Sequence, residues 1–276
     1  MAVKLRNPRR CKKGNSPAIS AVIITGVMVA LISVALSFAT NALFLRIAES
    51  EFSSARQFMQ TLGLQVDDVA WVIGQTETVR YSGRYGDVSF KQALNYTVYV
   101  NTTTETNRKL YTTTTGIVCY NMPVESYSVG YNYFELIHPA ADGTFLIGGA
   151  SAPVARIFAV EKLPMTDGSF LRVVVAPTIR MVNVSLSTAN YVRLYLPILL
   201  EGEAPKHSDS ITLTGQSVSR ISETVTGIKI KVTFPLDEFD NFFFQFPLAE
   251  ETIDLADETV LELYIGEVDV ALGVHL

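Results

Sequence analysis

A stretch of 28 residues without a charged side chain, residues 18–45, constrains this chain more than any other feature. A helix needs only about 20 apolar residues to cross the hydrocarbon core of a bilayer. Six basic residues and no acidic residue precede the stretch, and charged side chains return at Arg46, Glu49 and Glu51. By the positive-inside rule, this pattern predicts a single-pass protein of the cell membrane, with a cytoplasmic N-terminus and an extracellular head. Membrane lipid is therefore the first expected partner.

The apolar segment is also compatible with three common types of N-terminal signal or anchor. The apolar region of a cleaved secretory signal is usually about 7–15 residues long, and this one is about twice that, although small residues at Ala35, Ser37 and Ala39 mimic a cleavage site. The adjacent Arg9 and Arg10 resemble a twin-arginine export signal. An uncleaved single-pass anchor is the simplest alternative, because short motifs also arise by chance.

The junction between the basic leader and the apolar stretch is more specific. Lys12, Lys13 and Gly14 stand directly before Asn15, and Ser-Pro-Ala-Ile follows at residues 16–19. This junction resembles the class III signal peptide of archaeal type IV pilins and archaellins, which a prepilin peptidase cuts before the hydrophobic helix. The resemblance implies a cut between Gly14 and Asn15.

The resemblance also implies partners: a prepilin peptidase, and self-assembly or assembly with other pilin-like subunits. It covers about the first sixty residues, and it is limited to the archaeal branch, because Ile19 stands where bacterial type IV pilins carry a glutamate. A proline suits the first turn of a helix, and serine can cap one, so Ser16 and Pro17 predict the helix start.

The helix is expected to continue past the apolar stretch to about residue 73. Apolar or small residues recur at alternating spacings of three and four, which places them on one face. The polar residues between them, including Glu51, Arg56 and Asp67, are predicted to form a solvated face, and Gly63 could permit a bend. The apolar seam comprises Leu45, Ala48, Phe52, Ala55, Met59, Leu62, Val66, Val69 and Ile73.

Small residues within the apolar stretch form a narrow stripe at helical spacing. Such a stripe lets membrane helices approach closely. We expect this stripe to be a helix-packing surface, although small residues are common in any membrane helix. The stripe comprises Gly26, Ala30, Ser33 and Ser37, with Thr40 next along the same face.

After Gly74 the chain changes to short alternating runs rich in Tyr, Thr, Val and Ile, which predict β-strands. Their spacing favours a sandwich-like head, either of one lobe or of two lobes divided near residues 138–153. The predicted strands are 79–85, 93–100, 110–120, 145–148, 154–160, 170–175, 180–186, 191–196, 210–213, 227–234, 242–246 and 261–272.

Three sequons for N-linked glycosylation fall in the predicted exterior, at Asn95, Asn101 and Asn183. A chain rich in threonine and serine contains some sequons by chance, so they are candidate sites. Cys119 is expected to be a small buried side chain. After Gly14 there are 16 basic against 27 acidic residues, a net charge of −11, which disfavours nucleic-acid binding.

Catalytic motifs are missing from the sequence. The histidines His138, His207 and His275 are too far apart for a zinc or haem motif, and no nucleophile elbow or phosphate loop occurs. Acidic groups at 237–240 and 250–258 could hold calcium, but they lack EF-hand spacing and are better explained as solvated loops. A carbohydrate-binding face of Tyr81, Tyr85, Tyr131 and Tyr133 has no further support. We expect no enzyme, cofactor or metal.

The sequence therefore predicts an α+β protein: a long N-terminal hydrophobic helix, the pilin-like stalk, followed by a large all-β, sandwich-like head. The predicted parts are a leader at 1–14, a helix at 15–74 with a span at about 18–45 and an amphipathic extension at 46–74, and an extracellular head at 75–276. The expected function is that of a structural subunit of an archaeal type IV pilus-like surface filament, of a size that also fits a minor or tip subunit. It would serve adhesion or surface contact and be extracellular after processing. The alternatives are an uncleaved anchor that presents a binding domain, and an anchored hydrolase.

Overall fold

The computed structural model describes eight segments of the chain, residues 16–81, 83–130, 133–139, 145–161, 170–186, 190–202, 210–233 and 250–273. The chain divides into two compact units, Met1–Ile47 and Ala48–Leu276. The second unit therefore contains the C-terminal part of the helix together with all of the described strands. The prediction of a long apolar N-terminal helix followed by a large, mostly β head is confirmed.

Helix α1 spans Ser16–Ala70, 55 residues. It begins one residue before the predicted start at Pro17 and ends three residues before the predicted end at 73. Gly74 lies just beyond this end with a φ of 81°, a conformation that glycine adopts easily. The Gly74 N–H donates a 2.8 Å hydrogen bond to the carbonyl of Gly215 on the sheet, so the chain turns away from the helix axis at this point.

Eleven strands are described in the head. They are β1 (Thr76–Arg80), β2 (Asp87–Asn101), β3 (Arg108–Pro123), β4 (Phe134–His138), β5 (Leu146–Gly148), β6 (Ala155–Glu161), β7 (Phe170–Pro177), β8 (Ile179–Ser185), β9 (Asn190–Glu201), β10 (Ser210–Thr233) and β11 (Glu250–Leu272). The sequence missed β4. It also divided β10 into two strands, because Gly215 and the polar residues after it interrupt the apolar alternation. The predicted strand at 242–246 lies outside the described residues.

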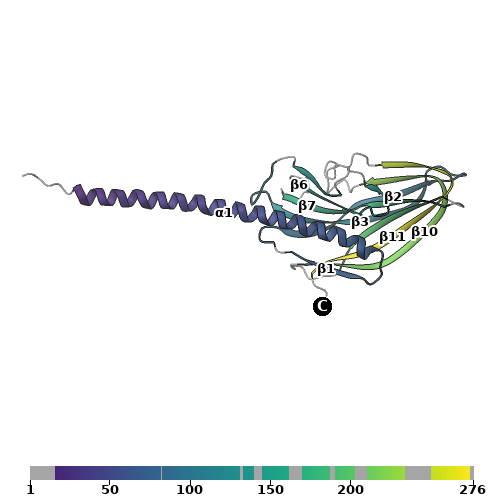
Figure 1. Ribbon diagram of the computed structural model, residues 1–276, viewed down its shortest axis with the longest axis horizontal. Coiled ribbons are helices and arrows are strands. Elements are labelled where there is room, and N and C mark those ends of the chain that lie inside the picture. The colour runs from purple at the N-terminus through teal and green to yellow at the C-terminus, as the bar shows by residue number, and fades with distance from the viewer. Residues whose placement is uncertain are drawn as a thin grey trace, which may run out of the picture. The chain divides into compact units, whose positions relative to one another are not determined.

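These strands form one hydrogen-bonded sheet in the order β4-β6-β7-β3-β2-β10-β11-β9-β8-β5, and β1 adds to β10. The neighbours are antiparallel except for β9 with β11 and β5 with β8, which are parallel. The long strands β10 and β11 follow one curved path together (Figure 1), with irregularities in their pairing at Gly215/Ser217 and Val225/Gly227. Such bulges bend a sheet and increase its twist.

The bent sheet encloses one of the two apolar cores of the head. Side chains from the β2–β3 and β6–β7 pairs contribute to it together with side chains from β9, β10 and β11. The Leu199 N–H on β9 donates a buried 2.8 Å hydrogen bond to the Thr115 hydroxyl on β3, although three strands separate β9 from β3 in the sheet order. The facing layers expected of a sandwich-like head thus belong to a single sheet. Cys119 is buried in this core, as expected.

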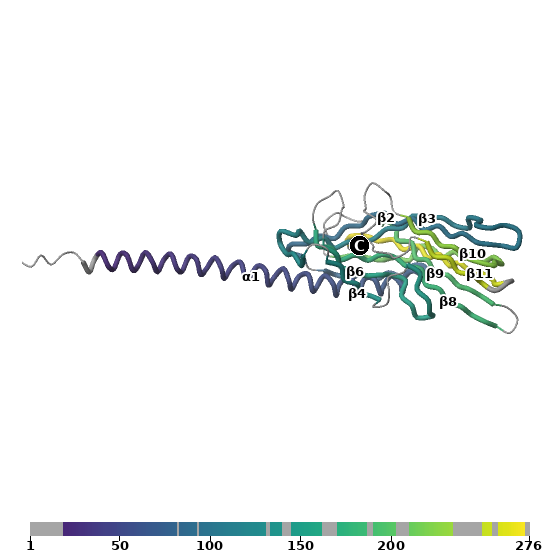
Figure 2. The backbone as a smooth tube through the Cα atoms, turned by 90° about the horizontal axis from the view of Figure 1, so that it is seen from above, coloured from purple at the N-terminus to yellow at the C-terminus, as the bar shows by residue number. Residues whose placement is uncertain are grey.

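The second core lies between the opposite face of the sheet and residues 48–70 of α1. Seven of the nine predicted seam residues are buried, from Ala48 to Val69, while Leu45 and Ile73 are exposed. Figure 2 shows this part of α1 running close to β4 and β6. At Gly63, a Cβ atom would lie 2.6 Å from Cδ1 of Ile157, so glycine allows close packing here. Because these residues share a core with the sheet, this part of the helix belongs to the head.

Candidate functional site

Most of the exposed large apolar side chains among the described residues lie on the apolar part of α1. Its large side chains between Ile19 and Leu45 are 50–72% exposed. Soluble proteins rarely expose an apolar patch of more than a few hundred Å². The helix is long and apolar enough to cross a membrane, and the signal sequence of an exported protein passes the same test. Such a surface needs lipid or other apolar helices around it.

Two hydroxyl groups in this part of α1 donate hydrogen bonds to the backbone of the helix itself. Ser33 donates a 2.9 Å hydrogen bond to the carbonyl of Val29, and Thr40 donates to the carbonyls of Leu36 and Ser37 at 3.0 and 2.9 Å. A polar group without a partner is costly in an apolar environment. These bonds therefore make both side chains compatible with lipid or with a packed helix.

The predicted packing stripe remains exposed within the chain. Gly26, Ala30, Ser33 and Ser37 all lie on exposed parts of the helix surface. A Cβ atom built on Gly26 would meet nothing within 4 Å. No contact inside the described chain therefore requires glycine at this position. Whether the stripe packs against other helices stays a prediction.

The predicted processing site lies outside the described residues. The described residues begin with Ser16, the first residue of α1, and so do not include Lys12, Lys13, Gly14 or Asn15.

The head holds the second part of α1 through a buried carboxylate. Oε1 of Glu51 accepts hydrogen bonds of 2.9 Å from the backbone N–H groups of Arg84, Tyr85 and Gly86. The same oxygen accepts a 2.6 Å bond from the hydroxyl of Tyr120 on β3. Glu51 is only 9% exposed, so the predicted solvated position is wrong. Four convergent donors compensate for the burial of its charge.

Near the C-terminal end of α1, Asp67 anchors the helix a second time. Both of its carboxylate oxygens accept hydrogen bonds from Arg180 on β8, at 2.7 and 3.0 Å, and Oδ1 also accepts one of 2.8 Å from the Trp71 indole. The Arg180 guanidinium lies over the ring of Tyr195, 5.0 Å from its centre. A bidentate arginine pair fixes direction as well as distance. Asp67 therefore sets how the helix end meets β8 and β9.

A third polar contact joins the middle of α1 to the edge strand β4. Arg56 forms an ion pair with Glu135, which also accepts a hydrogen bond from the hydroxyl of Tyr133. Burial, with a further contribution from this bond, raises the pKa of Tyr133 to about 12. Its hydroxyl thus remains a donor at neutral pH. Glu51 and Arg56 form separate contacts, as their spacing of five residues predicts.

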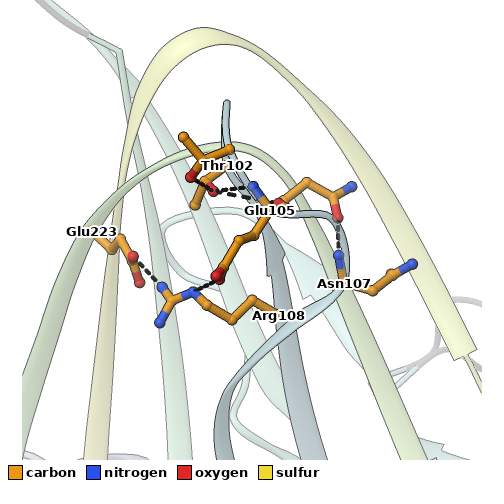
Figure 3. Close-up of polar contacts among 7 residues, drawn as sticks. Thr102, Glu105, Asn107, Arg108 and Glu223 are labelled. Atoms are coloured by element: carbon orange, nitrogen blue, oxygen red, sulfur yellow. Dashed lines mark hydrogen bonds and ion pairs between the residues drawn. The ribbon is translucent and has the colours of Figure 1, made fainter.

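Two of the three sequons lie on β2: Asn95 where β2 pairs with both β3 and β10, and Asn101 where it pairs with β10. Asn95 is half-buried, and its amide oxygen accepts a 2.7 Å hydrogen bond from the hydroxyl of Thr114 on β3. Asn101 ends β2, and its amide oxygen accepts a 2.8 Å bond from the Asn107 N–H in the β2–β3 turn (Figure 3). The third, Asn183, is exposed on β8. The structure therefore separates three sequons that the sequence treats alike.

The remaining candidates for chemistry do not come together among the described residues. No group of three potential metal ligands from His, Cys, Asp and Glu is present in the described segments. Tyr81, Tyr85 and Tyr133 pack against the core beneath α1 instead of forming one open face, and Tyr131 is not among the described residues. Of the acidic groups, Glu250 pairs with Lys229 across the β10–β11 ladder, whereas 237–240 lie outside the described segments.

The chain matches no protein-family model, no curated protein and no solved structure. Its functional assignment therefore depends on its own residues.

Sequence reasoning missed the anchoring carboxylates Glu51 and Asp67. Both lie among polar helix positions that resemble a solvated face. One available signal was that both flank the apolar seam, next to Phe52 and Val66, where a side chain can reach the edge of a helix–sheet contact.

Proposed function

We propose that this chain is a structural subunit of a type IV pilus-like surface filament of the archaeal kind. In this proposal, lipid first surrounds the apolar part of α1, a prepilin peptidase then removes the leader after Gly14, and the freed helix packs against the helices of other subunits. The head faces the medium and serves adhesion or surface contact. A head of this size suits a minor or tip subunit as well as a major one.

The observation that carries the proposal is the unequal burial of the two parts of α1. From Ile19 to Leu45 the large apolar side chains are at least half exposed, while from Ala48 to Ala70 the seam is buried in the head. Apolar surface removed from water contributes about 25 cal/mol per Å². The exposed part therefore represents a large driving force for insertion into lipid or for association with similar helices.

The anchoring contacts support a structural role, because they fix the orientation of the second part of α1 against the sheet. Glu51 and Asp67 fix the rotation of residues 48–70 against the sheet through directional hydrogen bonds. Neighbouring subunits would pack through the exposed part of the same helix. Repeated contacts of this heterologous kind generate an open helical polymer.

Determining the N-terminus of the protein extracted from membranes tests the proposal. A mature chain that begins at Asn15 supports it, and an intact leader supports the alternative, an uncleaved single-pass anchor. Gly14→Phe should block the cut and leave a precursor 14 residues longer. A start beyond Phe38 would show that the apolar part is a cleaved secretory signal and would overturn both the filament and the anchor.

The processing test needs a matched control. Gly26→Phe also adds a bulky side chain to a glycine, but it lies 12 residues after Gly14, within α1. It should leave the cut after Gly14 unchanged. Equal processing of the Gly14 and Gly26 variants would contradict the assigned cleavage site.

A further inference from the structure

The sequon at Asn183 lies on an exposed strand face. Asn183 and Ser185 are two residues apart on β8, so both side chains point to the same side of the strand. Both are exposed, and Leu186 directly after them is 56% exposed. The two side chains that define a sequon are thus presented together to solvent.

The strand that carries Asn183 is also open along one edge. On one side β8 pairs with β9, where Asn183 lies opposite Val192. On the other side β5 pairs only with residues 179–181. Within the described segments, no strand pairs with residues 182–185 on that side. An enzyme can therefore reach both the side chain and the backbone of the sequon.

The Asn95 sequon has neither property. Residues 95–100 of β2 pair with β3 on one side and with β10 on the other, so both strand edges are covered. The amide oxygen of Asn95 accepts the hydrogen bond from Thr114, and the Thr97 hydroxyl, the other half of the sequon, accepts a 2.8 Å bond from Thr112. Both recognition groups are already engaged in the folded head.

The side chain of Asn101, in the second sequon, is engaged by different contacts. Its amide oxygen accepts the bond from Asn107, and its amide nitrogen packs so closely against Gly227 that a Cβ there would lie 3.1 Å away. The backbone carbonyl of Asn101 also accepts a 3.2 Å bond from the hydroxyl of Thr226. The nitrogen that would carry a sugar therefore lies against the neighbouring strand.

We propose that Asn183 is the glycosylated residue of the folded head, and that Asn95 and Asn101 are shielded by the fold. The sugar donor is an oligosaccharide linked to a polyprenyl phosphate or diphosphate. Nδ2 of Asn183 forms a bond to C1 of the first sugar while the bond from C1 to the phosphate oxygen breaks. The electron pair of that bond leaves with the phosphate, and the amide nitrogen gives one proton to a base of the transferase.

A sugar at this position has a physical use. Unpaired strand edges promote association with other strands, and natural proteins protect them with bulky, polar or charged groups. A glycan on Asn183 places a large, hydrated group beside the open part of β8 and beside the exposed Leu186. It therefore protects this edge from unwanted pairing.

Glycosylation in vitro tests the selection directly and does not depend on the filament proposal. Full-length protein in detergent micelles, either folded or unfolded in urea and then diluted, is incubated with a purified oligosaccharyltransferase and its lipid-linked donor. Trypsin separates the sites, because it cuts after Arg180 and Arg193 to give peptide 181–193, and after Lys91 and Arg108 to give peptide 92–108. Mass spectrometry then locates the sugar.

The folded protein should carry sugar on peptide 181–193 alone, and the unfolded protein on both peptides. Asn183→Gln and, separately, Ser185→Ala should abolish the modification of the folded protein, while Asn95→Gln should leave it unchanged. Sugar on peptide 92–108 of the folded protein, or its absence from peptide 181–193, would overturn the proposal. So would an unmodified peptide 92–108 in both states, because the fold would then not be what excludes it.

The same peptides from protein extracted from producing cells give a second test. This arm also requires the head to lie on the side of the membrane where the transferase acts. A glycopeptide 181–193 together with an unmodified 92–108 supports the proposal, and the reverse pattern contradicts it. Since the in vitro result is independent of topology, a failure of the filament proposal is distinguishable from a failure of this one.

Discussion

The hydroxyl of Tyr120 on β3 donates a 2.6 Å hydrogen bond to the carboxylate of Glu51 on α1, and both residues are buried. Burial, together with this hydrogen bond and the nearby negative charge, raises the pKa of Tyr120 above its ordinary value. The hydroxyl therefore stays protonated and remains a donor. With the three backbone donors from Arg84 to Gly86, it fixes the helix on the sheet at one point.

Removing this carboxylate should weaken the head. Glu51→Ala leaves a buried hydroxyl and three N–H groups without their acceptor, and we expect a loss of about 2–4 kcal/mol in the free energy of unfolding. Glu51→Gln keeps an acceptor oxygen but removes the charge, so it should cost less. Gln57→Ala, at an exposed position of α1, serves as control and should change stability by less than about 0.5 kcal/mol. Denaturant unfolding in detergent measures all three, and equal stabilities would contradict the anchoring role.

We expect that a soluble fragment of the head folds only if it includes residues 48–70. A fragment of residues 46–276 keeps the second core and should fold cooperatively, whereas 77–276 should not. Phe52, Phe58, Met59, Leu62 and Val66 each contribute about 1.5–3 kcal/mol by burial, and the whole domain has only about 5–15 kcal/mol of stability. Circular dichroism and thermal melting distinguish the two fragments. Cooperative melting of 77–276 would show that the sheet does not need the helix.

A side chain at Gly266 should prevent the end of α1 from docking. A Cβ there would lie 2.2 Å from the carbonyl oxygen of Ala70, which is backbone and cannot move aside. Gly266→Ala should therefore lower the free energy of unfolding by about 1–3 kcal/mol. The matched variant Gly148→Ala meets nothing within 4 Å and should be nearly neutral. If both variants unfold at the same denaturant concentration, the close approach of the helix is wrong.

The stability of the head should fall in acid partly through Glu161. Burial by itself raises the pKa of this carboxyl, but hydrogen bonds from the Ser128 hydroxyl and the Gly130 and Val129 N–H groups outweigh it and hold the pKa below 4.5. Because the folded pKa is lower than the unfolded one, the stabilisation is present above about pH 4.5 and is lost as the pH falls through the folded value.

The Glu161→Gln variant isolates this effect. At pH 7 it should be less stable by about 1–2 kcal/mol, because it loses charge-assisted hydrogen bonds, and the difference should shrink below about pH 4.5. Glu125→Gln, an exposed neighbour in the preceding turn, provides the control. Unfolding curves of the three proteins between pH 3 and 7 give the comparison. A difference that is constant over this range would exclude titration of Glu161 as its cause.

Assembly, if the proposed function holds, should depend on the stripe at Gly26. Gly26→Leu adds volume to a surface that nothing in the described chain covers, so the head and membrane insertion should be unaffected. Close helix approach would be blocked, and filaments should be lost from the sheared cell-surface fraction. Met28→Leu, an exposed apolar position off the stripe, should assemble normally. Normal filaments from the Gly26 variant would remove the stripe from the interface.

Much of the helix could be predicted because its signals are local. Absence of charge from 18 to 45 marks the apolar part, the seam from Ala48 to Val69 follows a repeat of about 3.6 residues, and α1 ends within three residues of the predicted end. Most strands were predicted for a similar reason, since side chains alternate between the two faces of a sheet and β-branched and aromatic residues favour strands. Short β4 carries too few residues for such a pattern.

The candidate sites were less accessible from sequence. The three sequons have the same pattern in the sequence. In the structure, hydrogen bonds engage the side chains of Asn95 and Asn101, while Asn183 is exposed. Glu51 looks like a surface residue because its partners lie 33 to 69 positions away along the chain. Partners of this kind are set by strand order and register, which composition and local periodicity do not specify.

The sequence by itself determined which segment is too apolar for water, which face of α1 is apolar, and that a large β region follows it. These properties depend on hydration and on backbone geometry within a few residues. Only the tertiary structure decided that residues 48–70 belong to the core of the head, that one bent sheet encloses the other core, and which asparagine remains open. The physical reason is that burial and hydrogen-bond pairing are properties of residues brought together from distant parts of the chain.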